Sequence, residues 1–351
     1  MYEASELAPT NFSFFSPAKP LPPIAEGIFD YKDAFEAFLK ATDQKNHTAK
    51  IVGAFASNLK KREVLFNGDI IKVADLGCAD STTCMGYLTR MECPVGFDYL
   101  GFDINDKFLE DAEAILSRSA VIKKHVLIKK DVLVGELSAE PLVSPKSIDL
   151  VFVSHLAYYL KDEEYGKQFV NNILNLLNDK GIAIFLHEDS TYYFRSTYNC
   201  NYKNSSAPSL LKNSVTGLLE MPEQFKDISF TSKLHFAEMS EELWQAAKDP
   251  SLYKKYAYIP SFLDNLNKLS FIVQCDLSKL AHEGSLERFV NEMQHTLEAN
   301  NYTFNLVTRM QILVTAENSH IEQINLALKE TETENDVVLI PSISKPASLV
   351  N

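Results

Sequence analysis

The sequence predicts a doubly wound, Rossmann-like α/β fold, and three observations lead to this prediction. Short apolar segments typical of buried strands alternate with amphipathic helical segments between residues 70 and 186. An apolar run that ends at Asp75 is followed by a turn of small residues and then by a helical pattern. Two more strand patterns, separated by a helix, follow residue 259. Such an alternation builds a parallel sheet with crossover helices.

Composition and periodicity divide the 351 residues into five segments. They are an N-terminal arm and helices (1–66), a core of alternating strands and helices (67–194), an insertion or lid (195–258), a C-terminal part of the core sheet (259–316) and an acidic tail (317–351). The arm is rich in Pro, Ser and Phe, and the insertion is rich in Tyr, Asn, Ser and Lys. We expect the tail to be an appendage or partly disordered.

Apolar spacing then places the individual elements. Strands are expected at 70–75, 99–103, 125–128, 148–153, 182–186, 271–275 and 304–315, and helices at 31–41, 47–61, 82–91, 106–119, 163–177, 240–248, 261–268 and 285–300. The insertion interrupts this rhythm, because only residues 240–248 have a helical pattern there.

The net charge of −13 and the scattered basic residues argue against a nucleic-acid partner, whose phosphates require clustered Lys and Arg. The same balance disfavours anionic membranes, and no apolar stretch approaches the length of a membrane span. Five cysteines without a C-x-x-C pair fit a reducing compartment and give no metal-ligand spacing. With no secretory signal pattern, we expect a cytoplasmic protein that acts on a small molecule and holds no metal.

The most informative motif is the turn Asp75-Leu-Gly-Cys-Ala-Asp80 after the first strand. Small side chains in such a turn let a ligand approach the backbone N–H groups at a helix N-terminus. It has one glycine where a dinucleotide fingerprint has three. Its acid-x-Gly-x-small-x-small pattern resembles class I S-adenosylmethionine-dependent methyltransferases. That resemblance implies a seven-stranded sheet and S-adenosylmethionine as cofactor, bound by Asp75, Gly77, Cys78 and Ala79.

The ends of the next three strands add further candidates, because ligands of such sheets lie beyond the carboxyl ends of the strands. Asp103, followed by Ile104, can accept hydrogen bonds from both ribose hydroxyls of the cofactor. Asp131, followed by Val132, is expected near the adenine amino group. Ser154 follows the fourth strand and is expected beside the sulfonium. The alternative for the two acids is an exposed position in a loop.

The residues after Ser154 supply the candidates for catalysis. His155 is a candidate general base, but a structural donor or a cofactor contact is equally compatible with its position. Tyr158 and Tyr159 are expected to line the substrate side, or to pack in the core. His187, after the fifth strand, is expected as a secondary pocket residue.

Residues 31–43, 148–162, 262–266 and 276–278 resemble segments of the histamine N-methyltransferase family, including the Tyr-Tyr-hydrophobic-Lys-Asp order at 158–162. The resemblance implies methyl transfer to an amine nitrogen of a small molecule. It also implies a substrate site that contains Tyr31, Phe35, Asn305 and an acid position that falls at Asp43 or Gln44. If it is Gln44, the charge is absent.

Two other functions remain open. The Asp-Leu-Gly-Cys turn is also similar to carboxyl methyltransferases of plant secondary metabolism, so the acceptor can be a carboxylate or a protein side chain. A non-catalytic, cofactor-binding interaction protein is the other alternative, for example a bacterial effector whose acidic tail serves transport.

Overall fold

The structure is a computed structural model that describes residues 31–65, 70–198, 207–215, 218–219, 224–236, 238–273, 275–277, 280, 284–315, 318–335 and 338–340. The predicted N-terminal arm, Cys200 and residues 341–351 lie outside this set. The chain divides into two compact units. The sheet unit comprises residues 43–190, 204–233 and 305–351, and the helical unit comprises residues 1–42, 191–203 and 234–304.

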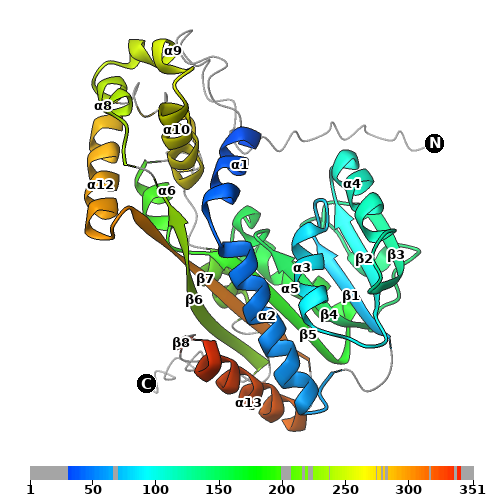
Figure 1. Cartoon of the computed structure of the whole chain (residues 1–351). Coiled ribbons are helices and arrows are strands. Elements are labelled where there is room, and N and C mark those ends of the chain that lie inside the picture. The colour runs from blue at the N-terminus through cyan, green and yellow to red at the C-terminus, as the bar shows by residue number, and fades with distance from the viewer. Residues whose placement is uncertain are drawn as a thin grey trace, which may run out of the picture. The chain divides into compact units, whose positions relative to one another are not determined.

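The sheet has the strand order β3-β2-β1-β4-β5-β7-β6-β8 (Figure 1). Its strands are β1 (Ile71–Leu76), β2 (Phe97–Asp103), β3 (Ile122–Lys129), β4 (Ile148–Ser154), β5 (Leu177–Glu188), β6 (Phe225–His235), β7 (Thr303–Val314) and the short β8 (Val338–Ile340). The first five strands pair in parallel, and β7 runs antiparallel to β5. The predicted seven-stranded, doubly wound α/β sheet is therefore confirmed, and β8 extends it at one edge.

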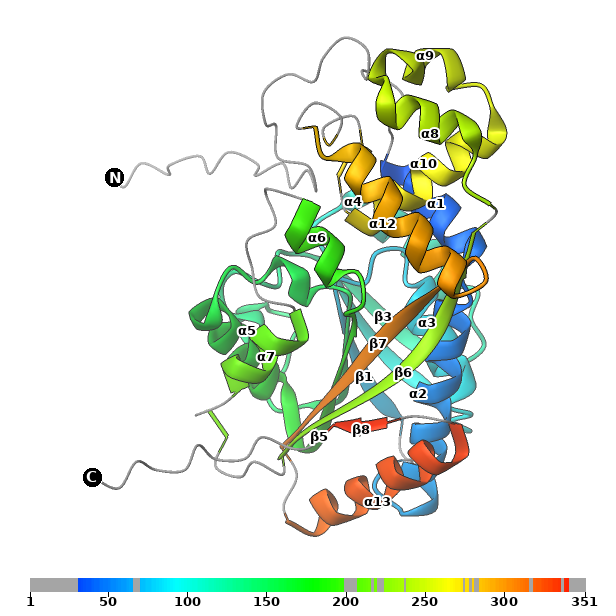
Figure 2. The same ribbon diagram turned by 90° about the vertical axis from the view of Figure 1, so that its left-hand side faces the viewer.

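Helices cover both faces of this sheet, because its central strands are apolar on both sides (Figure 2). The helices of the sheet unit are α2 (Gln44–Lys61), α3 (Thr82–Arg90), α4 (Asp106–Leu116), α5 (Glu163–Leu176), α7 (Ala207–Val215) and α13 (Asn318–Asn335). One core joins Phe55 of α2 and Leu88 of α3 to the sheet. The other joins Phe169 of α5 and Leu211 of α7 to the opposite face.

Among its described residues, the helical unit comprises α1 (Tyr31–Ala41), α6 (Tyr192–Tyr198), α8 (Glu241–Lys248), α9 (Tyr253–Tyr256), α10 (Pro260–Val273) and α12 (Leu286–Ala299). Aromatic contacts hold these helices together. The rings of Tyr253 and Phe262 are 5.6 Å apart, and those of Phe194 and Phe289 are 5.9 Å apart. Phe262 and Phe289 are fully buried, so they form the centre of this unit.

The prediction of a strand at 271–275 is wrong, because α10 continues to Val273. A short apolar run does not distinguish a buried helix from a strand, and here the helical pattern of the preceding residues extends through it. The sixth strand is instead β6, which lies inside the predicted insertion 195–258. Its end alternates buried Phe230, Ser232 and Leu234 with exposed neighbours, as expected for a strand with one buried face.

Within the predicted tail 317–351, the expectation of an appendage is wrong for residues 318–335, because α13 packs on α2. Ala327 and Leu328 are buried in the core that contains α2. The Asn58 side chain donates a hydrogen bond of 3.2 Å to Thr331 Oγ1, and Arg62 forms an ion pair with Glu330. The buried residues Ile321, Ile324, Ala327 and Leu328 recur every three to four residues and form one apolar face of α13. The acidic residues elsewhere on the helix make the overall composition acidic, so composition alone does not reveal this face.

Candidate functional site

The turn after β1 uses left-handed backbone conformations, which glycine adopts without steric cost. Gly77 has φ +76°, and an added Cβ would lie 3.1 Å from Leu156 Cδ1. The N–H groups of Gly77 and Cys78 both donate to the Phe102 carbonyl oxygen, at 2.9 and 2.8 Å. Ala79 also has a positive φ, of 45°. Strained residues of this kind persist where the surrounding structure fixes a functional loop.

Asp103 holds this turn from the end of β2. The Ala79 N–H donates to Asp103 Oδ2 at 2.9 Å, and the Asn105 N–H donates to Oδ1 at 2.9 Å. A carboxylate oxygen accepts more than one hydrogen bond, so both oxygens retain capacity for hydroxyl donors of a ligand. Ile104, the next residue, is 46% exposed and offers an apolar surface beside this carboxylate.

Whereas Asp103 is half-exposed, Asp75, near the end of β1, is buried. Its buried carboxyl group accepts a hydrogen bond of 2.7 Å from the Tyr99 hydroxyl, which also lies 2.9 Å from Ser81 Oγ. Burial raises the pKa of Asp75 to about 7, although hydrogen bonds from Tyr99 and Cys84 act in the opposite direction. Asp75 therefore supports the turn from inside the protein. The side chain of Cys78 is buried as well.

The end of β3 lies beside the end of β2, because the Lys130 N–H donates to the Asp103 carbonyl oxygen at 2.9 Å. Asp131 is half-buried, and its Oδ1 accepts a hydrogen bond of 3.0 Å from the Leu133 N–H. Val132 is buried. The structure thus brings the ends of β1, β2 and β3 together through backbone and carboxylate hydrogen bonds, as the fold prediction requires.

The end of β4 places His155 in a fixed orientation. Its φ is +57°, and its N–H donates to the Leu186 carbonyl oxygen at 2.8 Å. Its Nδ1 lies 3.1 Å from the Tyr158 hydroxyl, which donates to the Glu188 carbonyl oxygen at 3.2 Å and accepts from the Glu188 N–H. The Tyr158 hydroxyl is therefore bonded to the protein itself and orients His155.

Ser154 and Tyr159 flank this arrangement, and both are half-buried. Ser154 Oγ lies 3.5 Å from the hydroxyl of Tyr87, a buried residue of α3. This contact links the end of β4 to the helix that follows the glycine turn. The predicted position of Ser154 at the carboxyl end of a central strand is thus realised.

His187 is fully buried next to Tyr158, with the two rings 6.1 Å apart. Neither of its ring nitrogens has a hydrogen-bond partner among the residues that the structure describes. Burial lowers the pKa of His187 to about 3, and the nearby positive charges of His155 and Arg309 act in the same direction. The imidazole is therefore neutral, and it lies edge-on to the Tyr158 ring inside the protein rather than at its surface.

The predicted substrate residues are spread over several elements. Asp43 is exposed, and its carboxylate accepts a hydrogen bond of 2.9 Å from the Lys233 N–H. Gln44 is buried and donates to Thr308 Oγ1 at 3.2 Å. Asn305 is exposed on β7. Tyr31 and Phe35 lie on α1, in the helical unit, and their side chains are outside the described set. The substrate role of these residues stays a prediction.

The partners of the strand-end acids are not evident from the sequence pattern. Tyr99 precedes Asp103 by four residues, and only the parallel pairing of β2 with β1 brings it to Asp75. Arg309 is a second residue absent from the sequence-based prediction. Its guanidinium pairs with Asp227 through an Nε–Oδ1 bond of 2.8 Å and lies 3.5 Å from Asp189. A charged residue inside the apolar β7 pattern was the available signal for Arg309.

The described part of the chain contains neither a candidate membrane span nor a candidate metal-binding cluster. No helix there is long and apolar enough to cross a bilayer, and no group of three or more His, Cys, Asp or Glu side chains there is arranged to hold a metal ion.

No protein-family model matches the sequence, and a comparison with curated proteins finds no relative. Solved structures do match. A protein from Galdieria sulphuraria assigned as a sarcosine dimethylglycine methyltransferase is 12% identical, with 75% of this chain and 85% of that chain covered and a TM-score of 0.41. The N-methyltransferase NodS from Bradyrhizobium japonicum WM9 is 16% identical, with 54% and 86% covered and a TM-score of 0.33.

An S-adenosylmethionine-dependent methyltransferase from Clostridium acetobutylicum ATCC 824 is 20% identical, with a TM-score of 0.30. That match covers 41% of this chain, which spans about half (52%) of the length of the Clostridium protein. The strand order β3-β2-β1-β4-β5-β7-β6 with an antiparallel β7 is that of the class I methyltransferase fold.

Proposed function

We propose that this protein is an S-adenosylmethionine-dependent methyltransferase that acts on a small molecule, with an amine nitrogen as methyl acceptor. One observation carries the proposal. Asp103, at the end of β2, holds the glycine turn at the end of β1 through the Ala79 N–H, and this places a carboxylate beside a turn of small residues. A nucleoside needs both features. Its ribose donates two hydroxyl hydrogen bonds to the carboxylate, and small side chains let the nucleoside approach the backbone N–H groups of the turn.

The residues around the turn fit this cofactor. Asp103 would accept the ribose hydroxyls through the remaining capacity of its two oxygens. The exposed Ile104 side chain would cover one face of the adenine ring, and Asp131 would accept from the adenine amino group. When bound, S-adenosylmethionine supplies a methyl group on a positively charged sulfur. Asp75 would act indirectly, by supporting the turn through Tyr99.

Beyond the turn, the residues at the ends of β4 and β5 would position the acceptor. The contact between His155 Nδ1 and Tyr158 fixes the imidazole, and Glu188 in turn fixes Tyr158. His155 would then orient the acceptor or remove its proton. Because methyl transfer requires an in-line approach, this orientation and the exclusion of water would supply most of the acceleration.

Isothermal titration tests the cofactor part of the proposal. We expect wild-type protein to bind S-adenosylmethionine and its demethylated product, and Asp103→Ala to bind at least about tenfold more weakly, since a carboxylate that accepts two hydroxyl bonds contributes more than 1.4 kcal/mol. Asp106→Asn is the matched control. It removes the same charge three residues away, at an exposed acid that pairs with Lys129. Absence of binding to the wild-type protein would exclude the proposal.

A methyl-donor screen with mass detection tests the acceptor class. Small amines, small acids and peptides are offered separately to the wild-type protein and to His155→Gln. Methylated amines support the proposal. Products formed only from acids or peptides would replace the amine by a carboxyl or protein acceptor. Cofactor binding without any product would instead favour a non-catalytic interaction protein.

A further inference from the structure

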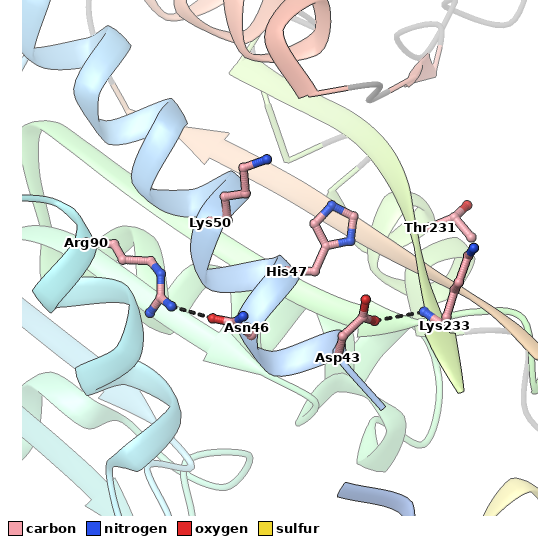
Figure 3. Close-up of a pocket in the computed structure, with 7 residues that line it drawn as sticks. All are labelled: Asp43, Asn46, His47, Lys50, Arg90, Thr231 and Lys233. Atoms are coloured by element: carbon pink, nitrogen blue, oxygen red, sulfur yellow. Dashed lines mark hydrogen bonds between the residues drawn. The ribbon is translucent and has the colours of Figure 1, made fainter. Parts of the chain in front are cut away.

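A hollow of about 540 Å³ opens on the sheet unit (Figure 3). It is lined by Asp43, which directly precedes α2, by Asn46, His47 and Lys50 of α2, by Arg90 of α3, and by Thr231 and Lys233 of β6. Asn46 and Lys50 are four residues apart, so they share one face of that helix. None of these residues belongs to the glycine turn or to the ends of β2, β3 and β4, so the hollow shares no residue with the proposed cofactor site.

The charge of this hollow opposes that of the whole chain. Its lining carries three cationic side chains and one carboxylate, within a protein of net charge −13. The carboxylate of Asp43 already accepts a hydrogen bond from the Lys233 backbone N–H. The Lys50 ammonium has no ion-pair partner among the residues that the structure describes. Like charges gathered in one hollow repel one another, and a bound anion removes that repulsion.

Hydrogen-bond donors in the hollow are held in place before any ligand arrives. The Arg90 guanidinium donates to the Gly86 carbonyl oxygen at 3.2 Å and to the Asn46 side chain, which leaves further N–H groups of its five available. The His47 ring is held edge-on against Phe230, at 5.4 Å between ring centroids. Figure 3 shows the Lys50 side chain and the His47 ring on the same side of α2.

We propose that this hollow binds a small molecule that carries a phosphate group. Ammonium, guanidinium and hydroxyl donors line this hollow from different sides, and Lys50, Arg90 and Thr231 supply one of each (Figure 3). This donor set suits phosphate, whose several oxygens accept from separate directions and whose charge exceeds that of a carboxylate. The volume lies within the range of small-molecule sites, so it holds more than one phosphate group or a phosphate attached to a larger body.

Isothermal titration with inorganic phosphate, pyrophosphate and adenosine diphosphate tests this proposal on the full chain. We expect pyrophosphate to bind more tightly than phosphate, and Lys50→Gln to weaken pyrophosphate binding about tenfold, since one charge-assisted contact is lost. The additional change Arg90→Gln should abolish binding. Tighter binding of the nucleotide than of pyrophosphate would show that the larger body is recognised too.

Lys124→Gln is the matched control. It removes the same charge, at an exposed lysine of β3 that lies outside the hollow. It should change the dissociation constant less than twofold. Acetylation of lysines followed by mass spectrometry gives a local readout: pyrophosphate should protect Lys50 and leave Lys124 reactive. Saturation with the demethylated cofactor should leave pyrophosphate binding intact. No saturable binding, equal losses in Lys50→Gln and Lys124→Gln, or competition by the demethylated cofactor would overturn the proposal.

Discussion

Replacement of Asp75 by Asn is expected to change the pH dependence of stability in a defined direction. The carboxyl group is buried and its pKa is raised from 3.8 to about 7, mainly by burial. Between these two values the folded protein holds a proton that the unfolded chain releases. Wild-type stability therefore falls as the pH rises from about 4 to about 7. An amide does not titrate, so Asp75→Asn lacks this loss.

The size of the effect follows from the shift. A raised pKa of this extent removes roughly 2 to 3 kcal/mol of wild-type stability between about pH 5 and about pH 8. The amide oxygen of Asn still accepts from Tyr99, so the turn keeps that contact. The variant should thus gain roughly 2 kcal/mol relative to the wild type over this interval.

Urea unfolding of both proteins at a series of pH values measures this difference directly. Subtracting the two curves cancels every other titrating group, including buried His187, whose contribution has the opposite slope below its ordinary pKa. Asp80→Asn, in the same turn but only half-buried, is the control and should follow the wild type. Parallel stability curves for the wild type and Asp75→Asn would refute the assignment of a buried, protonated carboxyl group.

Three further changes test other parts of the structure. Gly77→Ala should destabilise the protein by about 2 kcal/mol in urea unfolding and remove cofactor binding. Its control is Gly135→Ala, because Gly135 has a similar φ of +77° but open space where a Cβ would lie. That change should cost only about 1 kcal/mol and leave cofactor binding in isothermal titration unchanged. The wild type should lose roughly 2 kcal/mol of unfolding free energy between about pH 7 and about pH 5, since a His187 pKa lowered from 6.5 disfavours folding in acid. His187→Phe should abolish this loss, and an unchanged decrease of stability in acid would contradict the reasoning. Leu328→Ala should lower the free energy of unfolding by about 2 to 4 kcal/mol, because this side chain is buried in the core that contains α2. A decrease below about 1 kcal/mol, the size expected for a surface substitution, would mean that α13 contributes little to stability.

The sequence pattern predicted the central strands well because each is a short apolar run closed by a polar residue. β1 and β4 both fit this description, and the structure places their ends within one or two residues of the prediction. β6 was missed because its first half is buried without strict alternation, and it follows a polar segment. Conversely, residues 271–273 form the end of an apolar helix, and nothing in so short a run reveals its period.

The candidate site was predictable as a set of strand ends but not as a set of contacts. Asp75 and Asp103 are both acids at the ends of parallel strands, yet one is buried and the other is half-exposed. Asp75 lies on β1 between β2 and β4, and Tyr99 meets it only because β2 pairs with β1. Likewise, His187 contacts the ring of Tyr158, which comes from the turn after β4. Such pairings join residues far apart in the sequence, so no local pattern contains them.

The two strand-end acids therefore have different physical tasks, and this division follows from their environments. A carboxylate that binds a hydroxyl must be accessible, and Asp103 satisfies this because its half-exposed oxygens accept only two backbone N–H groups. A buried carboxyl group with a raised pKa serves poorly as an acceptor for a ligand, but it fits as an internal partner for Tyr99. Loss of the Asp75 charge should consequently leave cofactor affinity nearly intact at neutral pH, whereas loss of the Asp103 charge should remove it.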